Sequence, residues 1–130
     1  MVFSKEVTKE NFYKVYLSII NGLLHLTNKE IQVLSELLRL HELDARTKPG
    51  LTAEERSRLL FSFESRNILQ KRLGITQFNL NNYMKSLRTK RVIIVENDLY
   101  RINPMLIPTK NGKLTKIEFK LVETGELTNN

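Results

Sequence analysis

Apolar side chains recur at helical spacing near the start of the chain. From residue 12 onward they fall at i, i+4, i+7, i+11 and i+14, which places them on one stripe of an α-helix. The predicted helix covers residues 8–25. The stripe consists of Phe12, Tyr16, Ile19, Leu23 and Leu26. The sequence therefore predicts an amphipathic N-terminal helix with this stripe facing inward.

Two capping boxes predict the starts of the next helices. In each box a Thr precedes a Glu by three residues, so that hydroxyl and carboxylate can each accept a hydrogen bond from a free backbone N–H. The box at residues 27–30 opens a helix that should run to about His41. The box at residues 52–55 opens a short helix through about Phe61. The longer of the two should turn four residues inward: Ile31, Leu34, Leu37 and Leu38.

A helix–turn–helix pattern follows. Ser65 is the predicted cap of a helix over residues 66–73, and Gly74 stands where a helix end favours a residue with positive φ. Thr76 then caps a second helix over residues 77–89. The inner face of this second helix should carry Leu80, Tyr83 or Met84, and Leu87.

The periodicity changes from helix to strand after residue 91. The β-branched run at residues 92–95 and the run at residues 99–102 flank a polar turn at residues 96–98, which predicts a β-hairpin. A second strong turn signal, Asn-Gly, stands at residues 111–112. Beyond it, apolar residues alternate with charged ones, which predicts a half-exposed strand. These apolar residues are Ile117, Phe119 and Leu121.

Several helices followed directly by a hairpin outline a winged helix–turn–helix. The predicted fold class is α+β and mainly helical, with the first hairpin as the wing and an additional C-terminal hairpin. The chain would comprise an N-terminal packing or dimerisation helix (1–26), the winged helix–turn–helix domain (27–108), a C-terminal strand or hairpin (109–122) and a flexible tail (123–130). A length of 130 residues suits one domain with such extensions.

The net charge of +7 comes from one stretch of the chain. Residues 65–95 carry seven Lys and Arg residues and no Asp or Glu, whereas the other 99 residues carry 14 basic and 14 acidic side chains. A local basic excess of this kind is typical of a site for a polyanion. The alternative is a solvated helix face whose acidic partners come from elsewhere in the fold.

The composition also excludes several kinds of site. The chain has no Cys, which removes disulfide scaffolds, thiolate zinc sites and a cysteine nucleophile. It has no Gly-rich phosphate loop or nucleophile elbow, so we expect neither catalysis nor a cofactor. His25 and His41 each fall in the last turn of a predicted helix, where they suit the helix dipole, and no metal site is expected. Since neither a signal peptide nor a membrane-length apolar run is visible, we expect a cytoplasmic protein without membrane association.

The outward face of the second helix in the helix–turn–helix carries the candidate base contacts. Asn and Gln can pair bidentately with adenine, and Lys can reach the acceptors of guanine. The candidate base-reading residues are Gln77, Asn79, Asn81, Asn82 and Lys85. Basic residues in and after the motif would contact the DNA backbone. The candidate phosphate contacts are Arg66, Lys71, Arg88, Lys90, Arg91 and Arg101.

Two short passages carry a family resemblance. Residues 27–107 resemble winged helix–turn–helix proteins of the MarR-like superfamily. The resemblance is carried by the turn Leu-Gly-Ile-Thr at residues 73–76 and by the passage into the hairpin at residues 87–93. The Tyr-x-Ile-Asn-Pro stretch at residues 100–104 is similar to plasmid RepL-type and phage replication proteins. The resemblance implies that double-stranded DNA is bound with the recognition helix in the major groove. The protein would then be a transcriptional regulator or a plasmid- or phage-type replication initiator.

The predicted wing departs from a strongly basic wing. Glu96 and Asp98 occupy its tip, where phosphate would repel carboxylates, although Lys110 and Lys113 around the second turn could substitute. The alternative function is therefore a winged-helix docking or assembly module of a virion, replisome or polymerase that does not read DNA sequence. In either case the aromatic N-terminal helix suits a homodimer contact, and the wing suits a protein partner. The same basic surface would also suit RNA.

Overall fold

The computed structural model describes residues 2–6, 8, 10–107 and 116–120. Over these residues the protein is mainly helical with two antiparallel pairs of strands, an α+β arrangement. In chain order the elements are β1 (Val2–Glu6), α1 (Phe12–Leu24), α2 (Asn28–Thr47), α3 (Ala53–Leu60), α4 (Phe63–Leu73), α5 (Gln77–Thr89), β2 (Ile93–Glu96), β3 (Leu99–Ile102), the 3₁₀ turn η1 (Pro104–Leu106) and β4 (Lys116–Lys120).

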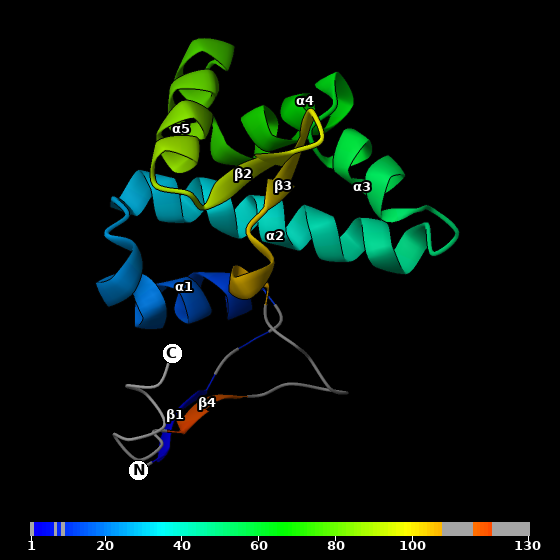
Figure 1. Cartoon of the computed structure of the whole chain (residues 1–130). Helices are drawn as coiled ribbons and strands as arrows, with labels where there is room; N and C mark the ends of the chain where they lie inside the picture. Colours follow the sequence, from blue (N-terminus) through cyan, green and yellow to red (C-terminus); the bar gives the residue numbers. More distant parts are fainter. Residues whose placement is uncertain (1, 7, 9, 108–115, 121–130) are drawn as a thin grey trace.

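Helix α2 is the central element of the fold. It contacts α1, α3, α4 and α5, and Figure 1 shows α1 on one side of it and the other helices with the β2–β3 hairpin on the other. The predicted capping box at its start is confirmed, with the Thr27 hydroxyl accepting from the Glu30 N–H at 3.2 Å and the Glu30 carboxylate accepting from the Thr27 N–H at 2.8 Å. The helix runs beyond the predicted end at His41 because no Gly or Pro interrupts it before Pro49.

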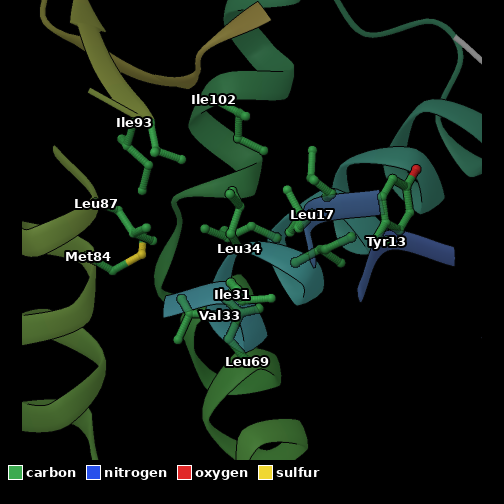
Figure 2. Packing of buried hydrophobic residues seen from close by; sticks show 14 of the residues in the cluster. Tyr13, Leu17, Ile31, Val33, Leu34, Leu69, Met84, Leu87, Ile93 and Ile102 are labelled. Atoms are coloured by element: carbon green, nitrogen blue, oxygen red, sulfur yellow. The ribbon is translucent and has the colours of Figure 1, made fainter. Parts of the chain in front are cut away.

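The hydrophobic core lies between α2 and the elements on both of its sides. All four predicted inward residues of α2 are buried, and Leu34 is fully buried at the centre of Figure 2. Leu17 approaches Leu34 from α1, and Leu87 and Ile93 approach it from α5 and the hairpin. Burying a leucine side chain contributes roughly 1.5–3 kcal/mol, so this cluster fixes the hairpin and α5 against α2.

Helix α1 differs from the prediction in its start and its inward face. Thr8 and Asn11 exchange side-chain-to-backbone hydrogen bonds of 2.7 and 3.2 Å ahead of the helix, which begins only at Phe12. The inward face carries Phe12, Tyr13 and Leu17. Placing Ile19 on that face was wrong, because its side chain is 40% exposed. Apolar residues occur on all sides of this segment, so their spacing alone does not select the buried face.

Helix α4 begins three residues earlier than predicted. Its cap is Ser62, whose hydroxyl accepts from the Ser65 N–H at 3.3 Å. Ser65 itself is buried, and its hydroxyl donates to the Leu59 carbonyl at 2.6 Å. The prediction that Ser65 is the cap was therefore wrong, because two serines three residues apart present the same local signal.

The turn between α4 and α5 confirms the predicted helix–turn–helix outline. Gly74 ends α4 with φ 64°, and its N–H donates to the Gln70 carbonyl at 2.8 Å. An L side chain is strained at that φ, which explains the glycine. The Thr76 hydroxyl then accepts from the Asn79 N–H at 3.1 Å, so that α5 begins at Gln77 as predicted.

The first predicted hairpin is confirmed as β2 paired with β3. Ile93 pairs with Ile102, and both are buried against the helices. The turn has two residues, Asn97 and Asp98, with φ 51° and 65°. Both values lie in the left-handed region, which tight hairpins require and which Asn and Asp tolerate best among residues with side chains. Glu96 therefore belongs to β2 and pairs with Leu99, rather than to the turn.

The additional C-terminal hairpin was predicted with the wrong partner. The strand near residue 117 forms as β4, but it pairs antiparallel with β1 at the other end of the chain, with Phe3 opposite Phe119. In Figure 1 this small sheet lies beyond α1, apart from the β2–β3 hairpin. The Asn-Gly turn at residues 111–112 lies outside the described residues, as do Lys110, Lys113 and Leu121. A local turn signal cannot show that a strand pairs with a segment more than 100 residues away.

Candidate nucleic-acid interface

Helix α5 presents a polar outer face. Leu80, Met84 and Leu87 hold the helix to the core, each at most 5% exposed. All five predicted base-reading residues, Gln77, Asn79, Asn81, Asn82 and Lys85, are exposed. The buried stripe thus leaves amide side chains and one ammonium group on the surface, and α5 bears no carboxylate.

The basic stretch at residues 65–95 divides into compensated and uncompensated cations. Arg72 pairs with Glu36 at 2.5 Å, and Lys90 pairs with Glu30 at 2.6 Å, so α2 supplies acidic partners to two of the seven. The other five have no ion pair with any described residue. We call these five the uncompensated cations: Arg66, Lys71, Lys85, Arg88 and Arg91.

Arg66 is tied to the candidate recognition helix. Its Nη1 donates to the Asn81 Oδ1 at 2.6 Å, which joins the side chains of α4 and α5. The amide oxygen of Asn81 has a second lone pair, and its NH₂ group still has both donors. Arg66 therefore orients the Asn81 amide without using up its capacity to bond to a base edge.

Arg88 lies at the junction between α5 and the hairpin. Its Nη1 donates to the Tyr100 hydroxyl at 2.9 Å, and its guanidinium carbon lies 5.3 Å from the centre of the Tyr100 ring. Together with Arg66 and Asn81, these two side chains line a cleft of about 120 Å³ between α5 and β3. The cleft combines two guanidinium groups with an amide and a phenol, a set of groups suited to an anion.

Arg91 follows α5 in an uncommon backbone conformation. Its φ is 61°, and its N–H donates to the Arg88 carbonyl at 3.0 Å while its own carbonyl accepts from the Asn103 side chain at 3.2 Å. Non-glycine residues with positive φ are uncommon. The two hydrogen bonds fix this backbone, and the exposed side chain of Arg91 is thereby held at the end of α5.

Lys90 is partly exposed, but its ammonium group is engaged within the fold. Its ammonium group pairs with Glu30 and also donates to the His25 carbonyl at 3.0 Å. Glu30 is buried, and its second oxygen accepts from the Ser86 hydroxyl. This Glu30–Lys90 node joins the ends of α1, α2 and α5, so Lys90 no longer belongs with the residues that would contact phosphate.

The Glu30–Lys90 node lowers the pKa of Glu30 to about 2. Burial raises the pKa, but the hydrogen bonds from Lys90, Ser86 and Thr27 to the carboxylate lower it and prevail. The folded-state value lies below the ordinary 4.5. The carboxylate therefore stabilises the fold fully above about pH 4.5, and this contribution is lost as the pH falls towards 2.

We expect acid denaturation to report this node. A shift of this size corresponds to about 3 kcal/mol of unfolding free energy, lost between about pH 4.5 and 2. Glu30→Gln should therefore show a flatter dependence of stability on pH in this range, measured by urea unfolding followed by circular dichroism. Glu64→Gln, at an exposed position of α4, is the control and should retain the wild-type slope. Equal slopes in Glu30→Gln and wild type would contradict the assignment.

The hairpin carries its own compensating charges. Arg101, predicted as a phosphate contact, forms an ion pair with Glu96, and Asp98 stands in the turn. Two apolar or aromatic side chains on the hairpin are exposed, Val95 at 56% and Tyr100 at 37%. The sequence predicted that the hairpin tip would not be basic, and the structure agrees.

The sequence pattern did not identify Phe78 as a surface residue. Its side chain is 73% exposed on α5, between the polar neighbours Gln77 and Asn79. The signal was present, because Phe78 falls out of phase with the buried Leu80 and Met84. Phe78 therefore adds one large apolar side chain to the otherwise polar outer face of α5.

Of the two histidines, His25 lies at the end of a helix as predicted, and His41 does not. His25 follows α1 as its C-cap with φ 55°, whereas His41 lies within α2 because that helix continues to Thr47. Burial and the nearby Arg56 lower the pKa of His41. Within the described part of the chain, no three His, Asp or Glu residues are grouped so that they could hold a metal ion. Over the same residues, no helix has the length and apolar character needed to cross a membrane.

No known protein family, characterised protein or solved structure matches the chain. The resemblance to MarR-like and RepL-type proteins therefore stays a prediction from sequence motifs. What the protein does must be inferred from the geometry of α4, α5 and the hairpin.

Proposed function

We propose that this protein is a winged helix–turn–helix protein that binds double-stranded DNA, with α5 as the recognition helix and β2–β3 as the wing. The observation that carries the proposal is the outer surface of α5, where exposed amides stand among the uncompensated cations. Such a surface attracts phosphate and offers donors and acceptors to base edges. The same activity would serve either a transcriptional regulator or a plasmid- or phage-type replication initiator.

The uncompensated cations would supply most of the affinity. Neutralising a phosphate releases condensed counterions, so the logarithm of the affinity falls with the logarithm of salt concentration by about 0.9 per contact. Lys85 is assigned to a base edge, so the other four cations would make the phosphate contacts and give a slope of roughly −3 to −4. Lys90 and Arg101 would not add to this slope, because Glu30 and Glu96 already pair with them.

The amides on α5 would supply sequence preference. Gln77, Asn79, Asn81 and Asn82 favour adenine, because an amide can donate to N7 and accept from N6–H. Lys85 would reach guanine O6 or N7 in the same groove. The mixture predicts a site that is mostly A·T with at least one G·C pair.

A docking module is the second candidate, and the hairpin favours it. Asp98 at the turn repels phosphate, while the exposed Val95 and Tyr100 offer apolar contact area to a protein. In that function the protein would associate with a replisome, polymerase or virion component, and binding would depend little on salt.

Selection from a random duplex pool tests the proposal. The purified protein is incubated with the pool at near-physiological salt, and the retained DNA is sequenced over several rounds. Enrichment of one motif is the expected result, and a two-fold symmetric motif would indicate a dimer with half-sites about 34–36 Å apart. Retention without enrichment would leave only a non-specific polyanion surface. No retention would contradict DNA binding and favour docking.

Phe78 should make the protein sensitive to the methyl group of thymine. An apolar side chain in the major groove can contact this methyl, and burying one methyl is worth about 0.8 kcal/mol. The wild type should therefore bind an alternating A·T duplex about three- to fivefold more tightly than the same duplex with uracil in place of thymine. Phe78→Ala should remove this preference, as measured by fluorescence anisotropy.

The matched control for Phe78 is Phe63, which is equally exposed on α4 at 70%. Phe63→Ala should keep the thymine preference, because α4 would lie outside the major groove. A wild-type protein that binds both duplexes equally would exclude a thymine contact by Phe78.

A further inference from the structure

A pocket of about 340 Å³ opens between α2, α3 and β3. No residue of α4 or α5 lines it, although Phe61 also lines the cleft between α5 and β3. Its volume falls in the range of about 300–1,000 Å³ that is usual for small-molecule sites. Part of its wall is apolar and consists of Leu51, Leu60, Phe61 and Ile102.

The polar part of the same pocket contains one cation without an acidic partner. Arg101 reaches the pocket but pairs with Glu96, whereas Arg56 forms no ion pair with any described residue. The Arg56 Nη2 donates to the Pro49 carbonyl at 3.2 Å, while its buried Nε–H lacks a hydrogen-bond partner. Buried polar groups are nearly always hydrogen-bonded, so this N–H is available to donate to an acceptor that enters the pocket.

His41 lines the pocket beside Arg56 and responds to its charge. Burial and Arg56 lower the pKa of His41, while Asp44 and Glu42 on the same helix act in the opposite direction. His41 is therefore mostly neutral at neutral pH, and the uncompensated positive charge of the pocket resides on Arg56. His41 also provides an internal reporter of any anion that enters.

We propose that this pocket binds a small organic carboxylate, with Arg56 holding the carboxylate and the apolar wall covering the hydrocarbon part. A guanidinium presents its N–H donors in a planar fork that matches carboxylate geometry. A single uncompensated charge suits a monoanion, and the apolar wall suits a hydrocarbon body rather than a free inorganic ion. Since Arg101 and Ile102 belong to β3, a bound molecule would also touch the base of the hairpin.

Three probes separate the two parts of this site. Cyclohexanecarboxylate carries both the charge and the hydrocarbon, its carboxamide carries only the hydrocarbon, and inorganic phosphate carries only the charge. Titration of the full chain, followed by ¹H–¹⁵N NMR at constant ionic strength, should give at least tenfold tighter binding of the carboxylate than of either other probe. The carboxylate should also raise the pKa of His41, and the carboxamide should leave it unchanged. Equal affinities for carboxylate and carboxamide, or for carboxylate and phosphate, would overturn the proposal.

Two variants and a matched control complete the test. Arg56→Met should weaken carboxylate binding at least tenfold, and Ser57→Leu should weaken it by filling the pocket while leaving Arg56 in place. Arg58→Met removes the same charge from the same helix at a residue that does not line the pocket, and it should bind as the wild type does. Loss of binding in Arg58→Met, or wild-type binding in Ser57→Leu, would place the ligand elsewhere. The result does not depend on DNA binding, so it stands whether or not the proposed function holds.

Discussion

Removing three of the uncompensated cations together should lower the affinity for duplex DNA by about a thousandfold or more. A hydrogen bond to a charged group contributes about 1.5 kcal/mol or more. Each lost phosphate contact also leaves the counterions at that phosphate bound to the DNA, so the salt dependence decreases. The variant combines Lys71→Gln, Lys85→Gln and Arg91→Asn, the last because Asn tolerates the positive φ at that position. Its salt slope should become shallower by about 1.8, because Lys71 and Arg91 are the two phosphate contacts among the three. Fluorescence anisotropy over a range of salt concentrations measures both effects.

A control with the same change in net charge makes this result specific. Lys14, Arg39 and Arg46 are exposed on α1 and α2, and none of them belongs to α4, α5 or the hairpin. Replacing these three by Gln should change the affinity by less than about threefold, because exposed charges more than about 10 Å from the DNA are largely screened. Equal losses in the two triple variants would mean that net charge, rather than the α4–α5 surface, governs binding.

Lys90→Met should be the most destabilising single replacement of a basic residue in the helix–turn–helix region. It removes the ammonium group that pairs with the buried Glu30 and that donates to the carbonyl of His25. Glu30 keeps its hydrogen bonds from Ser86 and Thr27, and Lys90 is partly exposed, so we expect a loss of about 2–3 kcal/mol in the free energy of unfolding. Urea denaturation at pH 7 measures this loss.

Lys85→Met is the matched control for Lys90. Lys85 is exposed on the same helix without an acidic partner, and its replacement should change stability by no more than about 0.5 kcal/mol. A double-mutant cycle with Glu30→Gln should show a coupling of about 1 kcal/mol or more between Glu30 and Lys90. If Lys90→Met were as stable as Lys85→Met, the structural role of Lys90 would be wrong, and Lys90 would again be a candidate phosphate contact.

Local signals predicted most of the helix starts and the turn between α4 and α5. The capping boxes at Thr27 and Thr52 form as expected, and Gly74 adopts the positive φ that its position required. These features involve residues only a few positions apart, so the chain close to each one determines them. The hairpin was predictable for the same reason, since its β-branched run and its polar turn are contiguous.

Features that depend on distant parts of the chain were not predictable. The Glu30–Lys90 pair spans 60 residues, and the pairing of β1 with β4 joins the two ends of the described chain. In the sequence Lys90 is one of several neighbouring basic residues, and only the folded structure shows that it pairs with Glu30 of α2. Ser65 was mistaken for the cap of α4 because Ser62, three residues earlier, presents the same local signal.

Mapping the DNA contact residue by residue tests the central claim most directly. A ¹⁵N-labelled protein is titrated with the duplex obtained from the selection, and amide shifts are followed by ¹H–¹⁵N NMR. We expect the largest changes from Gly74 to Arg91, with further changes at Arg66 and its neighbours. Changes confined to the β2–β3 hairpin or to α1, with the α5 amides unmoved, would contradict the assignment of α5 as the recognition helix.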